Sequence, residues 1–161
     1  MSNRRVAVTV SGEARSNSEH AFDVIAPIDL GSIFDRWMLI PGVEGVADQT
    51  GEWDAPGQTR TVILSDGSKV SEELLALDRP RSFEYRVGPL PSPIGRLARF
   101  AFGKWTFEQA GPQNTAITWT YSFEPARGRG ALVRFLIAPV WRQYARRALN
   151  KSISAVEAKL N

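Results

Sequence analysis

Three polar residues, Arg60, Glu72 and Tyr85, have the types and spacing of a small-molecule site. Each lies in a short strand-like segment and shares its period-two phase with apolar residues. These are Val62 and Leu64 for Arg60, Val70, Leu74 and Ala76 for Glu72, and Phe83 and Val87 for Tyr85. Side chains alternate between the two faces of a strand. If the three strands pair in order, a cation, a carboxylate and a phenol therefore share one apolar sheet face.

This arrangement has three interpretations, which the sequence leaves open. An apolar hollow with a few convergent polar groups is the usual form of a small-molecule pocket, in which the three groups would orient a ligand. In a catalytic site, Arg60 would stabilise an enolate, Glu72 would act as a base if burial raised its pKa, and Tyr85 would donate a hydrogen bond. The third interpretation is a buried Arg–Glu bridge without a ligand role, because buried charges are costly unless paired.

The composition excludes several other kinds of chemistry. His20 is the only histidine and there is no cysteine, so a metal site, a histidine triad and a disulfide all lack partners. The chain has no glycine-rich phosphate loop. We therefore expect no metal and no cofactor. The first residues lack the apolar core of a signal peptide, and no apolar run reaches the ~18 residues of a membrane span, so we expect a cytoplasmic protein.

Positive charge is concentrated at the C-terminal end. Residues 127–161 hold eight basic residues and one acid, a net charge of +7, whereas the chain as a whole carries +3. Such a segment suits a solvated helix face, an anionic membrane surface, nucleic acid or an acidic partner. The aromatic residues alternate into a predicted core instead of interleaving with lysines, which argues against nucleic acid. A membrane contact has no other support in the sequence, and nothing indicates an oligomeric state.

Strands are predicted along most of the chain. Residues 1–18 are expected to form an N-terminal arm or an extra strand, with alternation over 4–10, before a single domain at 19–161. Residues 19–26 are also predicted to form a strand. The further predicted strands are 43–53, 58–64, 69–78, 82–87, 98–109 and 115–124.

Two helices are predicted. Helical spacing of Leu30, Ile33, Phe34, Trp37 and Met38 indicates a first helix, capped by Asp29 and ended by Pro41-Gly42. A longer C-terminal helix carries an apolar stripe of Trp141, Ala145, Ala148, Leu149, Ile153, Val156 and Leu160. Pro139 predicts a kink or break between Leu132 and Trp141. An antiparallel sheet must cover its apolar face, and only this helix is large enough to do so.

The connection at 88–97 is unusually long and rich in proline for two strands that could otherwise form a tight hairpin. Its apolar residues Leu90, Ile94 and Leu97 give it something to bury. We expect it to fold over one end of the sheet and to gate a cavity beside Leu132 and Phe135. The alternative is a surface excursion with no gating role.

An ordered set of short motifs carries a family resemblance over roughly residues 19–160. They are Ala26-Pro27, Gly57 to Arg60, Asp66-Gly67 with Glu72 and Leu74, Asp78-Arg79-Pro80, Phe83-Glu84-Tyr85, Trp105 to Glu108 and Ile117-Thr118-Trp119. With the terminal helix, this set resembles the helix-grip superfamily (SRPBCC, START-like and Bet v 1-like proteins), in its polyketide cyclase/dehydratase and lipid-transport branch. The iron–sulfur and histidine-rich motifs of the oxygenase branch are missing.

The resemblance implies an α+β helix-grip fold, in which a curved antiparallel sheet of six or seven strands wraps a long C-terminal helix and a short helix follows the first family strand. It also implies a cavity for an apolar or aromatic ligand between sheet and helix. From their phase, the residues expected to line it beside Arg60, Glu72 and Tyr85 are Trp37, Val62, Leu74, Trp105, Phe107, Trp119, Tyr121, Phe135 and Trp141.

The resemblance does not fix an activity, and three hypotheses follow. The first is a binding protein for a small hydrophobic or aromatic molecule, lipid or polyketide-like. The second is an enzyme of cyclase or dehydratase type that uses Arg60, Glu72 and Tyr85. The third is an interaction module that uses the basic C-terminal helix.

Overall fold

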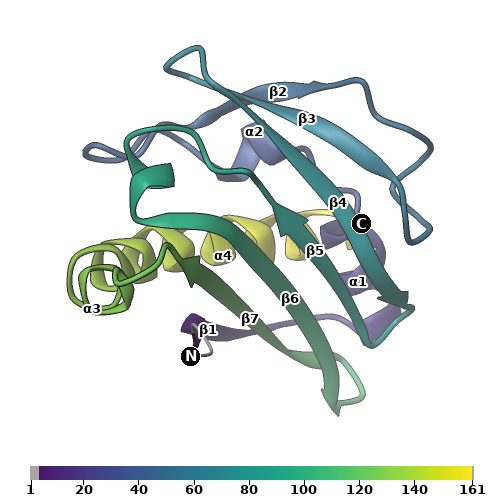
Figure 1. Ribbon diagram of the computed structural model, residues 1–161. Helices are drawn as coiled ribbons and strands as arrows, with labels where there is room; N and C mark the ends of the chain where they lie inside the picture. The colour runs from purple at the N-terminus through teal and green to yellow at the C-terminus, as the bar shows by residue number, and fades with distance from the viewer. Residues whose placement is uncertain (1–3, 161) are drawn as a thin grey trace.

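The computed structural model describes residues 4–160, which form a curved seven-stranded antiparallel sheet wrapped around a long helix (Figure 1). The α+β helix-grip architecture is therefore confirmed. The strand order is β1-β7-β6-β5-β4-β3-β2. The strands are β1 (Val6–Ala14), β2 (Val43–Ala47), β3 (Thr59–Leu64), β4 (Lys69–Asp78), β5 (Ser82–Val87), β6 (Ala98–Gly111) and β7 (Asn114–Pro125).

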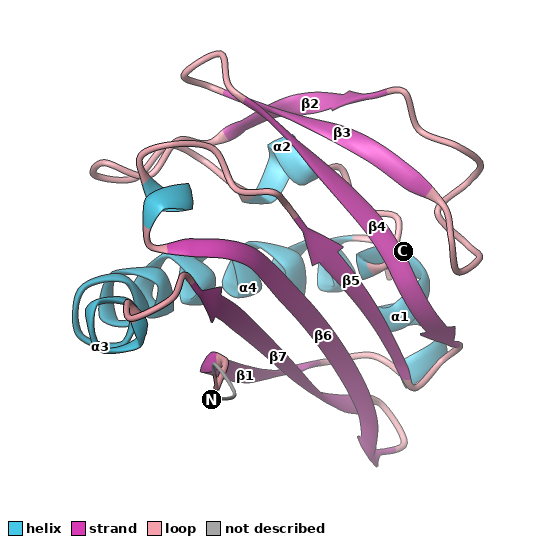
Figure 2. Ribbon diagram, in the orientation of Figure 1, coloured by secondary structure: helices cyan, strands magenta, loops and turns pink. Residues whose placement is uncertain are grey.

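Helices lie on the concave face of the sheet and at its ends (Figure 2). They are α1 (Ser18–Ile25), α2 (Leu30–Ile33), the 3₁₀ turn η1 (Ile94–Arg96), α3 (Gly130–Leu132), the π-helical turn η2 (Val133–Ile137) and α4 (Ala138–Ala158). None of the helices in the described part of the chain is long and apolar enough to cross a membrane.

Alternating burial fixes which sheet face meets the helix. In β7, Ile117, Trp119, Tyr121 and Phe123 are buried, and the residues between them are half-buried. Trp119 pairs with Trp105 of β6, and their rings stack with centroids 4.7 Å apart. Stacked aromatic rings of this kind bury a large apolar area at the centre of the sheet.

Residues 6–14, expected to be an arm or an extra strand, form β1 and pair with β7 along their whole length. Val8 and Val10 are fully buried. The strand also packs on the C-terminal helix, where a Cβ added to Gly12 would lie 2.7 Å from Ile153 Cδ1. A side chain at Gly12 would therefore have to displace the end of the Ile153 side chain.

The strand predicted at 19–26 is wrong, because these residues form α1. Asn17 caps the helix by accepting a hydrogen bond from the His20 backbone N–H at 2.8 Å. The His20 ring lies 2.9 Å from the Val156 carbonyl oxygen and ties α1 to α4. In a segment this short, apolar spacing does not separate a strand from about two turns of amphipathic helix.

The first predicted helix is much shorter than expected. Asp29 caps it as predicted, by accepting from the Gly31 N–H at 3.1 Å, but α2 ends at Ile33. The chain then turns back, and the Val43 N–H donates to the Phe34 carbonyl at 2.8 Å. A Cβ on Gly42 would lie 2.6 Å from the Arg36 nitrogen, so this close backbone crossing requires glycine. Likewise β2 ends at Ala47, earlier than the strand predicted at 43–53.

The C-terminal helix is interrupted where Pro139 predicted a kink or break. The π-helical turn η2 precedes α4, and Pro139 occupies the first turn of α4, where no N–H is required. The buried face of α4 includes Ala145, Ala148 and Leu149. The two alanines allow the helix to lie close to the sheet.

Candidate ligand cavity

A cavity of about 390 Å³ lies between the concave sheet face and the helices. Its sheet wall consists of Val43 of β2, Arg60, Val62 and Leu64 of β3, Val70 and Glu72 of β4, Phe83, Tyr85 and Val87 of β5, Trp105 of β6, and Tyr121 and Phe123 of β7. The opposite wall comes from α1, α2, the residues after α2, η2 and α4. Leu39 and Leu136 line the cavity yet are 97% and 59% exposed, so the cavity opens between them.

Arg60 and Glu72 face each other across β3 and β4 in the sheet wall. The Arg60 Nη2 donates to Glu72 Oε1 at 3.0 Å, and the residues are only 7% and 5% exposed. The Arg60 guanidinium also lies over the Trp53 ring, 4.0 Å from its centroid. Its Nε finds no hydrogen-bond partner among the described residues. The pair is thus a buried ion pair in an apolar cavity wall, and the cation retains unused hydrogen-bonding capacity.

Burial raises the pKa of the Glu72 carboxyl above its usual range, because the charged form is desolvated. The charge of Arg60 and its hydrogen bond act in the opposite direction. Desolvation is the larger effect, so Glu72 takes up a proton more readily than an exposed glutamate does.

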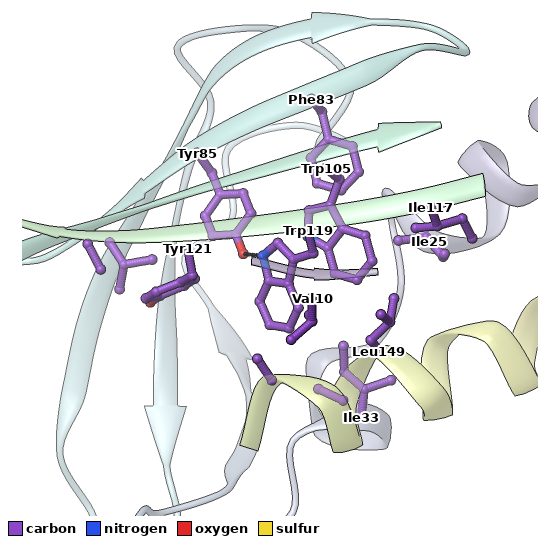
Figure 3. Packing of buried hydrophobic residues seen from close by; sticks show 14 of the residues in the cluster. Val10, Ile25, Ile33, Phe83, Tyr85, Trp105, Ile117, Trp119, Tyr121 and Leu149 are labelled. Atoms are coloured by element: carbon purple, nitrogen blue, oxygen red, sulfur yellow. Dashed lines mark hydrogen bonds between the residues drawn. The ribbon is translucent and has the colours of Figure 1, made fainter. Parts of the chain in front are cut away.

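Tyr85 lies beside this pair, with its ring against β6. Its hydroxyl oxygen accepts a hydrogen bond from Trp119 Nε1 at 3.1 Å (Figure 3). Its ring occupies the space that a side chain at Gly103 would fill. Burial, reinforced by the charge of Glu72, raises the pKa of Tyr85 well above its usual range. The group therefore stays a neutral phenol whose own O–H can donate.

The raised pKa of Glu72 predicts how the stability of the fold depends on pH. The native state binds this proton more tightly than the unfolded state, so Glu72 favours folding below about pH 4.5 and loses that contribution as pH rises through the native pKa. Relative to the Glu72→Gln variant, the wild type should lose stability as pH rises above 4.5. Urea unfolding at a series of pH values measures this, with Glu73→Gln on the other sheet face as control. A wild type that gains stability relative to Glu72→Gln over this range would contradict it.

The structure brings together part of the predicted lining. The three polar residues line the cavity with Val62, Trp105, Tyr121 and Trp141. Leu74, Phe107 and Trp119 are buried in the core but are not part of the cavity wall. Phe107, for example, packs on Phe22 of α1 with centroids 5.3 Å apart. The roles of all these residues in ligand binding stay predictions.

Two predicted lining residues lie away from the cavity. Trp37 follows the early end of α2 and sits near Arg147, whose guanidinium carbon is 6.0 Å from its ring centroid. Phe135 is 71% exposed, because it lies in η2, where the π-helical turn rotates the expected helix face. Neither lines the cavity, which corrects the sequence-based lining.

Other lining residues escaped sequence reasoning. Trp53 comes from the turn after β2, and no periodic pattern places its ring on Arg60. Tyr144 of α4 lies one turn from Trp141, a spacing that could have indicated it, and its hydroxyl donates to the Pro41 carbonyl at 3.0 Å.

The proline-rich connection 88–97 lies against the cavity as expected, since Leu90, Pro91, Ser92, Pro93 and Ile94 line it. On the helix side the lining includes Leu136 and Ile137, whereas Leu132 and Phe135, the expected neighbours, are not part of it. A gating role of this connection stays a prediction.

A family model for polyketide cyclase / dehydrase and lipid transport proteins matches residues 5–161. The chain belongs to this family. The match covers nearly the whole sequence, and it places the protein in the helix-grip superfamily. A search of curated proteins finds no match.

Solved structures of the superfamily share this fold at low sequence identity. The Zhui aromatase/cyclase from Streptomyces sp. R1128 is 16% identical, with a TM-score of 0.72 over 98% of this chain and 97% of its own. Ara h 8.0201 is 14% identical, with a TM-score of 0.72 over 97% and 100% of the two chains. Norcoclaurine synthase from Thalictrum flavum, in complex with dopamine and hydroxybenzaldehyde, is 10% identical, with a TM-score of 0.69 over 98% and 89%. At these identities the likeness to the three structures establishes the fold alone.

Proposed function

We propose that this protein binds one small hydrophobic or aromatic molecule, lipid or polyketide-like, in the cavity, and acts as its carrier or sensor. The observation that carries the proposal is the cavity itself: about 390 Å³ of space, walled by aromatic and aliphatic side chains, with few polar groups. Cavities of this size and composition are typical of small-molecule sites. A cytoplasmic location, expected from the sequence, is part of the proposal.

The polar groups suggest which kind of ligand fits. Arg60 has an Nε without a partner among the described residues, and the Tyr85 hydroxyl accepts from Trp119 while its own proton remains available. Both groups lie in the sheet wall and are donors. A ligand with an apolar or aromatic body and an oxygen acceptor, such as a carbonyl, hydroxyl or carboxylate, suits this wall.

Two features favour binding over catalysis. Glu72 is already paired with Arg60 at 3.0 Å, so neither group is free in this geometry to take a proton from a substrate. The raised pKa of Tyr85 keeps the phenol neutral, so it is a hydrogen-bond donor and not a base. Both features suit groups that orient a ligand.

A cyclase or dehydratase reaction is the second candidate. The specific observation in its favour is the raised pKa of Glu72, because a carboxyl with a raised pKa is better matched to general base work. This candidate requires that Glu72→Gln abolish turnover of a polyketide-like substrate while ligand affinity is retained. Unchanged turnover in that variant would exclude it.

Filling the cavity tests the binding proposal. Val62 points into the cavity from β3, so Val62→Trp should occupy ligand space and weaken binding of the apolar fluorescent probe anilinonaphthalene sulfonate by about tenfold or more. The matched control is Thr61→Trp, which adds the same side chain at the next residue of β3, on the other sheet face. Fluorescence titration measures both affinities.

The two variants also define the contradicting result. Circular dichroism first establishes that each variant is folded. If Val62→Trp binds the probe as tightly as wild type and Thr61→Trp, the probe does not occupy this cavity and the proposed site is wrong.

A further inference from the structure

The mouth of the cavity is unusually apolar on its outer side. Six of the nine exposed large apolar side chains of the described residues belong to two segments, residues 38–39 and 132–140. Among them, Met38 is 67%, Leu39 97%, Phe135 71% and Leu136 59% exposed. Both segments border the cavity, because Leu39 and Leu136 line it. We call these four residues the mouth patch.

Unpaired positive charge surrounds the mouth patch. Exposed arginines lie in the segments that reach this end of the molecule, namely the chain after α2, η1, the link before α3, and η2 (Figure 1). They are Arg36, Arg96, Arg127, Arg129 and Arg134. None of the five has an ion-pair partner among residues 4–160.

Some cations elsewhere on the surface are paired, whereas others, including Arg4, Arg146 and Lys159, have no ion-pair partner among residues 4–160. Arg15, Arg79, Arg81, Arg86 and Lys104 each lie within 4.0 Å of a carboxylate. At the mouth end, the carboxylate of Asp35 is paired with Lys151 and that of Asp66 accepts from Ser68. The five arginines therefore leave positive charge without a paired carboxylate of residues 4–160 near the opening of the cavity.

We propose that the mouth end docks on the surface of an anionic lipid bilayer, so that the cavity exchanges its ligand directly with the membrane. The mouth patch enters the boundary between headgroups and acyl chains, and the arginines bind lipid phosphates. A bilayer fits better than a protein partner because these apolar side chains protrude, as Leu39 does at 97% exposure, instead of lining a groove that a partner would fill. An apolar ligand is also concentrated in lipid.

Arg134 and Phe135 provide a test, because both are exposed and neither lines the cavity. Wild-type protein should co-sediment with vesicles of phosphatidylcholine and phosphatidylglycerol, but far less with phosphatidylcholine alone, and binding should weaken as salt is added. Arg134→Glu and Phe135→Ser should each weaken binding to the anionic vesicles by about tenfold.

Lys159 and Leu160 supply matched controls at the other end of the molecule, beyond the end of α4. As with Arg134 and Phe135, a basic residue there precedes an exposed apolar residue. Lys159→Glu and Leu160→Ser should leave vesicle binding unchanged. All four variants should still bind anilinonaphthalene sulfonate, so a failure of docking is distinct from a failure of the cavity proposal.

Three results would overturn the docking proposal. One is wild-type protein that does not bind anionic vesicles at low ionic strength. Another is an equal loss of binding in the variants at both ends. The third is wild-type protein that binds no vesicles but forms a dimer in sedimentation velocity, where Phe135→Ser abolishes the dimer. In that case a second copy of the chain covers the mouth patch.

Discussion

Arg60→Ala should lower the free energy of unfolding by about 3–5 kcal/mol, because it leaves the Glu72 carboxyl buried without its cation. The Glu72 side chain is only 6% exposed, so water replaces little of the lost interaction. The loss of packing on Trp53 adds to the effect. Urea unfolding of wild type and variant at neutral pH measures the difference.

Two further variants test whether the cost of Arg60→Ala comes from leaving a buried charge unpaired. Replacing both partners, as Arg60→Met with Glu72→Leu, should cost much less than Arg60→Ala, since no charge is then left unpaired in the wall. Arg81→Ala breaks an exposed pair with Asp78, whose side chains are 74% and 55% exposed, and should cost under ~1 kcal/mol. If Arg60→Ala costs no more than Arg81→Ala, the pair is solvated, and its proposed role in orienting a ligand loses its basis.

Gly103→Val should lower the free energy of unfolding by about 3 kcal/mol. A Cβ at this position overlaps the Tyr85 ring, so the tyrosine must leave its place on β6 and lose the hydrogen bond from Trp119. The matched control is Gly45→Val in β2, where a Cβ meets no atom within 4 Å. Valine itself favours strands, so the control also removes the effect of strand propensity.

Urea unfolding curves and tryptophan fluorescence emission spectra test this prediction. Gly103→Val should shift the emission, because Tyr85 no longer covers Trp119, whereas Gly45→Val should leave it as in wild type. Equal stability of the two variants would mean that Tyr85 has room to move without loss, and its position as a fixed donor in the cavity wall would be wrong.

The sheet wall of the site could be predicted from sequence because two periodic strands and one tight turn determine it. Residues 65–68 form the predicted hairpin turn between β3 and β4, and the register that follows places Arg60 opposite Glu72. The alternation of β7 likewise predicted which of its aromatic residues are buried. Local patterns suffice where side-chain phase and turn chemistry agree.

The helix side of the cavity could not be predicted in the same way. Its residues come from irregular segments, such as the chain after α2 and the turn that carries Trp53, whose paths depend on tertiary contacts. The π-helical turn η2 shifts the phase of the C-terminal helix, so the pattern read back from Trp141 placed Phe135 on the wrong face. A helical period extrapolates correctly only while the helix stays regular.

Native mass spectrometry of the purified protein tests the central claim most directly. Wild type and Thr61→Trp should each carry a non-covalent small molecule that is released on denaturation, or take up one equivalent of anilinonaphthalene sulfonate. Val62→Trp, with its cavity filled from β3, should do neither. Equal occupancy of wild type and Val62→Trp, or a wild type that carries no molecule and takes up no probe, would contradict the claim that this cavity holds a ligand.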